Sequence, residues 1–413
     1  MTVVEFFDTN AVENIISMLL CAPEKVVLVG DSRKRMLKAK ERYEDIAAAH
    51  GIPVTFLCET VNRNDLQDII EKLDNIVAKH GECAFDLTGG EDLYLVAVGT
   101  VFCTHRDKVQ LHRFNINNGK LYDCDADGRL IACKQVSLTV QHNVKAYGGR
   151  VIFEDEKPKT THRWDFNQEF CADLTRMWNI SKKDFPRWNL AVNTLDDFHT
   201  YCMQDTASLS VFIETEKVKE TLKRKGTEAF LSGGFFKELE TYDLINGLTF
   251  STTGIAFTYK NEQVKRCLTN AGRVLELFVT QTAKQLTDEN GNPLFDDVMT
   301  GVSIDWDGEL QADTQDVDNE IDVMLMKDVT PIFISCKNGR NFKSDELYKL
   351  STVAERFGGQ YAKKVGIATQ IPEMQERGEA IVNRATEMGI TVIKIKNDDL
   401  CEQRFTEALR KLG

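Results

Sequence analysis

The sequence predicts an α/β protein of two or three domains that begins with a parallel, Rossmann-like sheet. Three observations support this fold class. The chain has 413 residues, which is more than ordinarily fold around a single hydrophobic core. Its hydrophobic share of 42% and charged share of 28% are those of a globular protein. Apolar, strand-like runs alternate with helical patterns over residues 1–150.

The expected strands and helices of residues 1–150 alternate as in a series of βαβ units. The strand-like runs are 3–7, 25–30, 53–58, 83–87 and 109–115, and the helical patterns are 11–20, 33–50, 66–80 and 91–103. Strands joined by helices pair in parallel, and the helices then cover both faces of the sheet. Ligands of such sheets lie beyond the carboxyl ends of the strands. We therefore expect residues 1–150 to form one ligand-binding domain.

Three loops at these strand ends carry the candidate ligand-binding residues, which are Asp8, Thr9, Asn10, Gly30, Asp31, Ser32, Thr88, Gly89, Gly90 and Glu91. Glycines let backbone N–H groups approach an anionic ligand at the start of a helix, and the hydroxyl groups add donors. The same residue types also suit helix capping, so the loops alone leave both interpretations open. Neither the G-x-G-x-x-G fingerprint nor a Walker A loop is present, which excludes a dinucleotide-dependent oxidoreductase.

Composition and residue spacing exclude several classes of protein and of metal site. A net charge of −13 argues against a protein that coats nucleic acid permanently, although a local basic groove is compatible with it. The 11 cysteines form no C-x-x-C pair and the seven histidines show no H-x-x-x-H spacing, so no structural zinc site is expected. No signal-peptide pattern and no run of about 18 apolar residues occur. We expect a cytoplasmic protein with reduced thiols and no membrane partner.

Residues 160–265 predict a winged-helix-like middle domain. Helical patterns are followed by two strand-like runs, 247–250 and 255–259, which flank a turn at 251–254 and resemble a two-stranded wing. Winged-helix modules can bind DNA. Positive charge is not concentrated here, so we expect a spacer or dimerisation role.

The strongest functional pattern lies in residues 266–413, the expected C-terminal domain. An amphipathic helix is expected over 268–284, and it contains Gly272 and Glu276. Strands are expected over 298–306, 320–326 and 332–337. The last two strands are joined by a short turn and should pair as a hairpin, with Glu276 projecting toward them from the helix.

Alternation along the hairpin places ionisable side chains together. Glu320, Asp322 and Met324 should share one face of the first strand, and Ser335 and Lys337 one face of the second. We therefore expect Asp322 to meet Lys337 across the pair. For these two residues alone, a structural salt bridge is the simpler interpretation.

Together with Glu276, the same residues suit phosphodiester cleavage. That reaction uses a hard divalent cation to polarise the phosphoryl group and activate water. Carboxylates bind Mg²⁺ or Mn²⁺, and the candidate ligands are Asp322, Glu276 and Glu320. A lysine can orient the water and offset developing negative charge. We predict that Asp322, Lys337, Glu276, Glu320 and Ser335 form a catalytic site.

The order of G-x-x-x-E, then Asp, then a strand ending in x-x-K resembles the PD-(D/E)xK nuclease superfamily, which has a restriction-endonuclease-like α/β fold. The N-terminal sheet with its Thr88, Gly89 and Gly90 loop is similar to a CRISPR-associated Rossmann-fold (CARF) domain. The whole chain resembles the CARF–nuclease effectors of type III CRISPR systems.

That resemblance implies a homodimer whose paired CARF domains bind a cyclic oligoadenylate, often the tetramer. It implies allosteric activation of a Mg²⁺- or Mn²⁺-dependent nuclease that cuts DNA or RNA in antiviral defence. We expect the hinge between sensor and nuclease at about residues 148–165. Asp322 would be the metal-binding aspartate, Lys337 the catalytic lysine and Glu276 the helix carboxylate. This chain departs from the pattern at Ser335, where the superfamily usually has Asp or Glu. The departure supports an alternative, a non-catalytic sensor or DNA-binding regulator with a degenerate nuclease domain.

Overall fold

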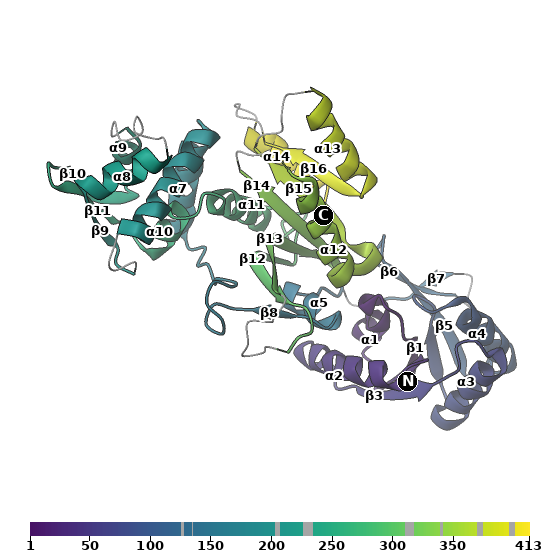
Figure 1. Ribbon diagram of the computed structural model, residues 1–413. Helices are drawn as coiled ribbons and strands as arrows, with labels where there is room; N and C mark the ends of the chain where they lie inside the picture. The colour runs from purple at the N-terminus through teal and green to yellow at the C-terminus, as the bar shows by residue number, and fades with distance from the viewer. Residues whose placement is uncertain are drawn as a thin grey trace.

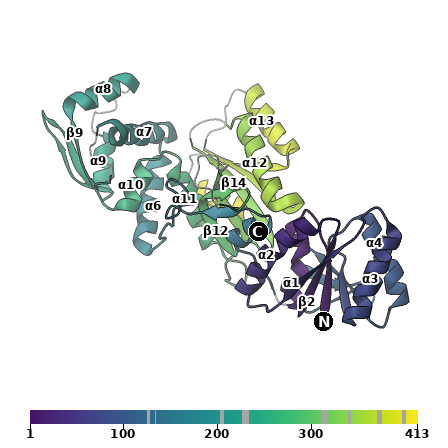
Figure 2. The same ribbon diagram turned by 60° about the horizontal axis from the view of Figure 1, so that its bottom comes forward.

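The structure is a computed structural model that describes residues 1–124, 128–133, 135–202, 207–225, 234–309, 318–338, 342–369, 375–395 and 401–413. Three sheets organise these residues, and Figure 1 and Figure 2 show them as three bodies in a row. We propose the division expected from the sequence, with an N-terminal domain (1–150), a middle domain (160–265) and a C-terminal domain (266–413). The C-terminal domain lies between the other two (Figure 1).

The N-terminal sheet has the order β3-β2-β1-β4-β5-β6-β7, in which β1 to β5 run parallel. Its strands are β1 (Thr2–Phe6), β2 (Lys25–Gly30), β3 (Thr55–Thr60), β4 (Cys83–Asp86), β5 (Val109–Asn115), β6 (Lys120–Asp123) and β7 (Arg129–Leu130). Every residue of β1 is buried, as expected for a central strand covered on both faces. The strand order reverses between β1 and β4, so the loops after them meet at a topological switch point. The predicted Rossmann-like sheet is confirmed.

Helices cover both faces of this sheet (Figure 1). On the face toward the C-terminal domain lie η1 (Ala11–Asn14), α1 (Ile16–Cys21) and α2 (Arg33–Ala49), and on the opposite face lie α3 (Leu66–His80) and α4 (Asp92–Thr104). The single helix expected over 11–20 is divided. Ile15, with φ −126°, separates the 3-10 turn η1 from α1.

The middle domain has the expected winged-helix-like arrangement. It contains α6 (Gln168–Ser181), α7 (Phe185–Cys202), β9 (Ser210–Glu214), α8 (Thr215–Lys225), α9 (Gly234–Thr241), β10 (Ile245–Phe250), β11 (Gly254–Tyr259) and α10 (Glu262–Leu268). The hairpin β10–β11 matches the predicted wing, and β9 adds a third strand beside β11.

The C-terminal domain is built on a mixed sheet of order β16-β15-β14-β13-β12-β8. Its strands are β8 (Arg150–Ile152), β12 (Asp297–Asp305), β13 (Asp318–Lys327), β14 (Thr330–Lys337), β15 (Lys363–Ala368) and β16 (Ile390–Lys394). Its helices are α11 (Arg273–Gln285), α12 (Ser344–Gly358), η3 (Gly359–Tyr361), α13 (Gln375–Glu387) and α14 (Cys401–Arg410). Helix α5 (Val140–Ala146), at the end of the N-terminal domain, packs against this sheet. Strand β8 comes from a segment that precedes the middle domain in the sequence.

Both faces of the C-terminal sheet pack against other domains. On β13, Val323 and Leu325 belong to a hydrophobic cluster shared with the middle domain, whereas Met324 and Met326 belong to one shared with α2 and α5. At the middle-domain contact, Trp178 of α6 stacks on Phe278 of α11 with ring centroids 3.9 Å apart. Because interiors are closely packed, a movement of either neighbour is transmitted to this sheet.

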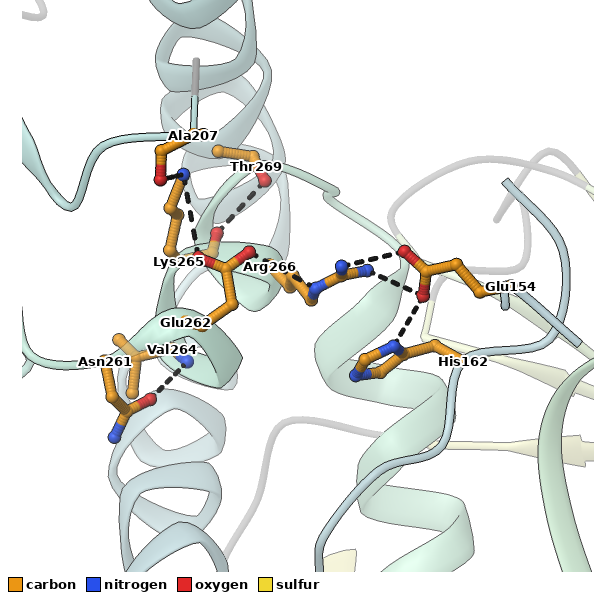
Figure 3. Close-up of polar contacts among 9 residues, drawn as sticks. All are labelled: Glu154, His162, Ala207, Asn261, Glu262, Val264, Lys265, Arg266 and Thr269. Carbon is orange, nitrogen blue, oxygen red and sulfur yellow. Dashed lines mark hydrogen bonds and ion pairs between the residues drawn. The ribbon is translucent and has the colours of Figure 1, made fainter. Parts of the chain in front are cut away.

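The segment that follows β8 is bonded to the middle domain. Glu154 accepts hydrogen bonds from both terminal nitrogens of Arg266 on α10, at 3.2 and 2.8 Å (Figure 3). His162 Nδ1 lies 2.6 Å from Glu154 Oε2. Burial raises the pKa of Glu154, but Arg266 and His162 outweigh it and lower the pKa overall. A hinge near 148–165 stays a prediction, and motion there would have to break these contacts.

Among the described helices, none is long and apolar enough to cross a membrane.

A buried pair of carboxyl groups lies inside the N-terminal sheet. Glu5 on β1 and Asp86 on β4 are each 1% exposed. Burial, and then the charge of Asp86, raise the pKa of Glu5 well above its ordinary value, and burial raises the pKa of Asp86. The folded protein therefore binds protons more tightly than the unfolded chain. The pair favours folding most below the ordinary carboxyl pKa, and this contribution is lost as the pH rises through the raised pKa values.

We expect Glu5→Gln to increase the free energy of unfolding at about pH 8 by on the order of 1–3 kcal/mol, because one of two buried charges is removed. The increase should shrink toward about pH 4. Denaturant titration at both pH values measures this, and Glu24→Gln at an exposed position is the control. A Glu5→Gln protein less stable than its parent at the higher pH would contradict the interpretation.

Candidate active site and ligand-binding loops

Asp322 lies where β13 and β14 separate. The last paired residues of the two strands are Val323 and Ile334, while β14 continues to pair with β15 as far as Lys337. Beyond the ladder, Asp322 Oδ2 accepts hydrogen bonds from the Cys336 backbone N–H at 2.6 Å and from the Ser335 hydroxyl at 3.1 Å. The carboxylate therefore accepts the hydrogen bond that a backbone carbonyl of β13 would accept if the two strands continued to pair.

This geometry refines one expectation about the hairpin and corrects another. Ser335 is the neighbour of Asp322 across the pair, while Lys337 lies near enough for the charge of Asp322 to raise its pKa. Met324 does not share the face of Asp322. Ile321 and Met324 pack in the same cluster although three residues apart, which a regular strand forbids. The alternation of faces shifts at Asp322, opposite Gly301 of β12, which has φ +58°.

Glu276 projects from the first turn of α11 toward the strands. The helix expected over 268–284 begins only at Arg273, with Gly272 as its N-cap residue. Glu276 is 8% exposed, and its Oε2 accepts a hydrogen bond from Arg273 at 2.8 Å. Burial is the largest cause that raises the pKa of Glu276, and the positive charge of Arg273 opposes it. The negative charges of Asp322 and Glu320 add to the effect of burial, and the pKa is raised to about 7. The structure thus brings the three predicted carboxylates within electrostatic reach of one another.

Lys337 ends β14 beside this acidic group. Its Nζ lies 3.4 Å from Glu346 Oε1, and Glu346 Oε2 accepts the Lys343 backbone N–H at 3.0 Å, which fixes the carboxylate at the start of α12. Burial lowers the pKa of Lys337, but Asp322 and Glu346 outweigh it and raise the pKa overall. Lys337 is therefore a cation at neutral pH, suited to stabilising negative charge and not to accepting a proton.

Sequence reasoning missed Arg273, Gly301 and Glu346. Arg273 bonds Glu276 and lies 4.0 Å from Glu320, so it sits between two predicted metal ligands. A Cβ at Gly301 would lie 2.9 Å from Nη1 of Arg273, so the guanidinium would have to shift, and the φ of +58° there also favours glycine. The i, i+3 spacing of Arg273 and Glu276 was a usable signal. No local pattern links Gly301 or Glu346 to the site.

Among the described residues, no group of three His, Cys, Asp or Glu side chains converges in the manner of a metal site. The oxygen donors of Asp322, Glu276 and Glu320 still suit a hard divalent cation. The raised pKa of Glu276 reflects burial and neighbouring carboxylates, a cost that a cation relieves. To reach one ion together, Glu276 and Glu320 would have to exchange Arg273 for the metal.

The predicted ligand-binding loops meet at the switch point of the N-terminal sheet, and several of their groups already have partners. Thr88 donates its hydroxyl to Asp86 at 2.5 Å and accepts the Phe114 backbone N–H at 2.9 Å. Ser32 caps α2 by accepting the Arg35 backbone N–H at 3.5 Å. These two hydroxyls support the loops, and ligand contacts would fall to the backbone amides and the remaining side chains.

The side chain of Arg63 forms ion pairs with acidic residues of two of these loops. Arg63 lies 3.7 Å from Asp31 and 3.3 Å from Glu91. It was not among the predicted residues, and it brings the loops after β2 and β4 together. Gly90 has φ +105°, and a Cβ there would lie 3.0 Å from the Cβ of Phe6 in the core. Replacement of Gly90 would therefore strain the fold as well as the loop.

The loop after β1 contacts the C-terminal domain. Asp8 accepts the Asn10 backbone N–H at 2.9 Å and the Thr9 hydroxyl at 3.2 Å, which shapes the loop. Glu13 Oε1, in η1 just beyond it, accepts hydrogen bonds from the Tyr361 hydroxyl and from Gln360 Nε2. Both partners lie next to β15.

Comparisons with known proteins agree with this architecture. Residues 261–408 match the family described as the Card1-like endonuclease domain. The resemblance to CARF–nuclease effectors is confirmed. No curated protein matches the sequence.

Two solved structures share the fold of the entire chain. Protein VC1899 from Vibrio cholerae is 18% identical with a TM-score of 0.74, and the match covers 100% of this chain and 97% of that one. Can2 from Sulfobacillus thermosulfidooxidans, solved in complex with cyclic tetra-adenylate, is 15% identical with a TM-score of 0.62, over 99% of this chain and 96% of that one. At these identities the likeness concerns the fold.

Thr88 gives a test of how the loop after β4 is held. Thr88→Val should lower the free energy of unfolding by about 1–3 kcal/mol, because Asp86 loses a donor and the Phe114 amide loses its acceptor. Thr88→Ser keeps both hydrogen bonds and should retain most of the stability. Equal unfolding midpoints for the Val and Ser variants in urea would show that the hydroxyl has no such role.

Proposed function

We propose that this protein is a cytoplasmic, divalent-metal-dependent nuclease that is activated by a cyclic oligoadenylate and cuts DNA or RNA in type III CRISPR defence. One observation carries the proposal. A domain that matches Card1-like endonucleases places Asp322, Glu276 and Glu320 together with a charged lysine at the separation of two strands.

The roles of the residues follow from their positions. Asp322 would be the central ligand of Mg²⁺ or Mn²⁺, because its Oδ2 is held by Ser335 and Cys336 while Oδ1 accepts no hydrogen bond from the described residues. Glu276 and Glu320 would supply further oxygens after release of Arg273. The bound metal would polarise the scissile phosphate and lower the pKa of an attacking water.

Two cationic side chains would act on the phosphate. Lys337, kept charged by Asp322 and Glu346, would orient the water and offset negative charge as the phosphoryl group is attacked. Arg273, displaced from the carboxylates, would lie close enough to bind a phosphate oxygen. Glu346 would be a positioning residue, since it acts by holding Lys337.

The N-terminal domain would bind the activator. Can2, which has the fold of this whole chain, was solved in complex with cyclic tetra-adenylate. A ring with two-fold symmetry fits a homodimer in which the same loops of both subunits surround one ligand. The predicted loop residues, from Asp8 to Asn10, Gly30 to Ser32 and Thr88 to Glu91, lie at the switch point where such a ligand would sit.

Ser335 supports a second function that can be tested. Its hydroxyl donates to Asp322, where the nuclease superfamily usually supplies another carboxylate. A ligand set weakened in this way favours a non-catalytic sensor or DNA-binding regulator. The two functions differ in one measurement, the cleavage of nucleic acid by the full chain.

We expect cleavage of labelled DNA or RNA when Mn²⁺ and cyclic tetra-adenylate are both present. Asp322→Asn should lower the rate at least about 100-fold, because it removes the central ligand charge. Lys337→Ala should lower it about 10- to 1,000-fold, whereas Ser335→Ala should lower it less than about tenfold. The control is Lys349→Ala, an exposed position on α12.

Two results would count against the proposal. If Asp322→Asn cuts as fast as the parent protein, the active site lies elsewhere. If the parent protein cuts nothing with any cyclic oligoadenylate or divalent metal, the chain is a sensor or regulator.

A further inference from the structure

A cavity of about 670 Å³ lies between the N-terminal and C-terminal domains. Its wall is formed by α2, the loop after β1, the end of α5 and the end of α12 with η3. Its volume is within the range of ligand pockets, roughly 300–1,000 Å³. Figure 1 shows α2 on the side of the N-terminal sheet that faces the C-terminal domain.

The cavity is lined by four basic side chains. Arg35, Lys38 and Arg42 line it from α2, and their spacing of three and four residues places them on one face of that helix. Arg356 comes from α12 of the C-terminal domain. Arg35 and Lys38 are exposed, and Lys38 Nζ lies 3.4 Å from Glu309 Oε1, so the half-buried basic groups of the cavity are Arg42 and Arg356.

Arg42 and Arg356 are half-buried without a carboxylate partner among the described residues. Within that same set, Nε of Arg42 is buried and has no hydrogen-bond partner. Arg356 donates to the carbonyls of Tyr147 and Trp306 at 2.6 and 3.2 Å, which uses two of its five N–H groups. Burial lowers the pKa of both groups, and the charge of Arg42 lowers that of Arg356 further, which places the two cations near each other.

The acidic residues of the cavity wall are occupied elsewhere. Asp8 accepts hydrogen bonds from its own loop, from Asn10 and Thr9. Glu355 accepts the Ser351 hydroxyl at 2.8 Å and lies 3.6 Å from Lys364. Among the described residues, neither half-buried guanidinium group is ion-paired to a carboxylate, although the charge of Glu41 acts on Arg42. Two such groups lining one cavity cost free energy unless an anion joins them.

We propose that this cavity binds a phosphate group of a nucleotide, held between Arg42 of the N-terminal domain and Arg356 of the C-terminal domain. Guanidinium groups pair with phosphate oxygens through two parallel hydrogen bonds, and the exposed Arg35 adds long-range attraction. A phosphate bound here bridges two domains, so it stabilises their contact in proportion to its occupancy. The phosphate can belong to a free nucleotide or to a cyclic oligonucleotide, and both present the same chemistry.

The test is isothermal titration calorimetry on the full chain with three probes, which are ATP, inorganic pyrophosphate and cyclic tetra-adenylate. We expect Arg42→Gln to weaken the binding of at least one probe by about tenfold or more. Arg42→Lys should weaken it less, because the charge remains. Lys34→Gln, an exposed residue of α2 outside the cavity, should stay within about twofold of the parent.

The probes separate the two sources of phosphate. Arg42-dependent binding of ATP or pyrophosphate identifies a free-nucleotide site, and Arg42-dependent binding of cyclic tetra-adenylate alone identifies a contact to the activator. Arg356→Lys should weaken the same probe as Arg42→Gln and provides a second test from the opposite domain. If no probe binds, or if Arg42→Gln binds every probe as the parent does, the proposal is overturned. Binding is measured without cleavage, so a failure of the proposed nuclease function leaves this result readable.

Discussion

The two hydrogen bonds that Asp322 accepts from β14 are the interaction on which the candidate site depends. They satisfy the Cys336 amide at the point where β13 leaves the ladder, so the strands can separate without an unpaired buried N–H group. The separation exposes the end of β14, where Lys337 stands, to the helix that carries Glu276. A single side chain thus shapes the site and supplies its central charge.

Electrostatic balance at the site is the second constraint. Three carboxylates and Lys337 lie close together, and Arg273 and Glu346 complete the set with one further charge of each sign. Glu346 holds Lys337 in place, while Arg273 offsets the repulsion that raises the pKa of Glu276. Gly301 makes room for that arginine. In the proposed function, a metal ion would replace Arg273 beside Glu276 and Glu320.

The position of the C-terminal sheet explains how a distant ligand could affect this site. Its two faces pack on two different domains, so the sheet has no independent core. Glu13, next to the loop after β1, contacts Gln360 and Tyr361, which precede β15. Strand β15 pairs with the part of β14 that carries Ser335 and Lys337. Displacement of the loop after β1 would therefore act on the candidate site through η3 and β15.

Much of the fold was predictable because it follows from local patterns. Apolar runs alternating with helices specified the parallel sheet, and the spacing of Glu320, Asp322, Ser335 and Lys337 located the candidate site. What was missed depends on contacts between distant segments. The shift of alternation lies at Asp322, which stands opposite Gly301 and bonds the Cys336 amide, so period-two reasoning placed Met324 on the wrong face.

Contacts between side chains of different elements could not be predicted from the sequence either. Arg42 and Arg356 belong to domains at opposite ends of the chain, and Lys337 and Glu346 belong to different elements. Strand β8 pairs with β12 in a sheet whose other strands come after the middle domain in the sequence, and no local sequence pattern predicts that pairing.

Binding of Mn²⁺ to the C-terminal domain of the full chain tests the central claim most directly. Electron paramagnetic resonance should show Mn²⁺ bound to the parent protein, with affinity reduced at least about tenfold in Asp322→Asn, because the central ligand charge is lost. Glu24→Gln, far from the site in the N-terminal domain, should bind Mn²⁺ as the parent does. Equal affinity of the parent and Asp322→Asn for Mn²⁺ would contradict a metal centre at the separation of β13 and β14.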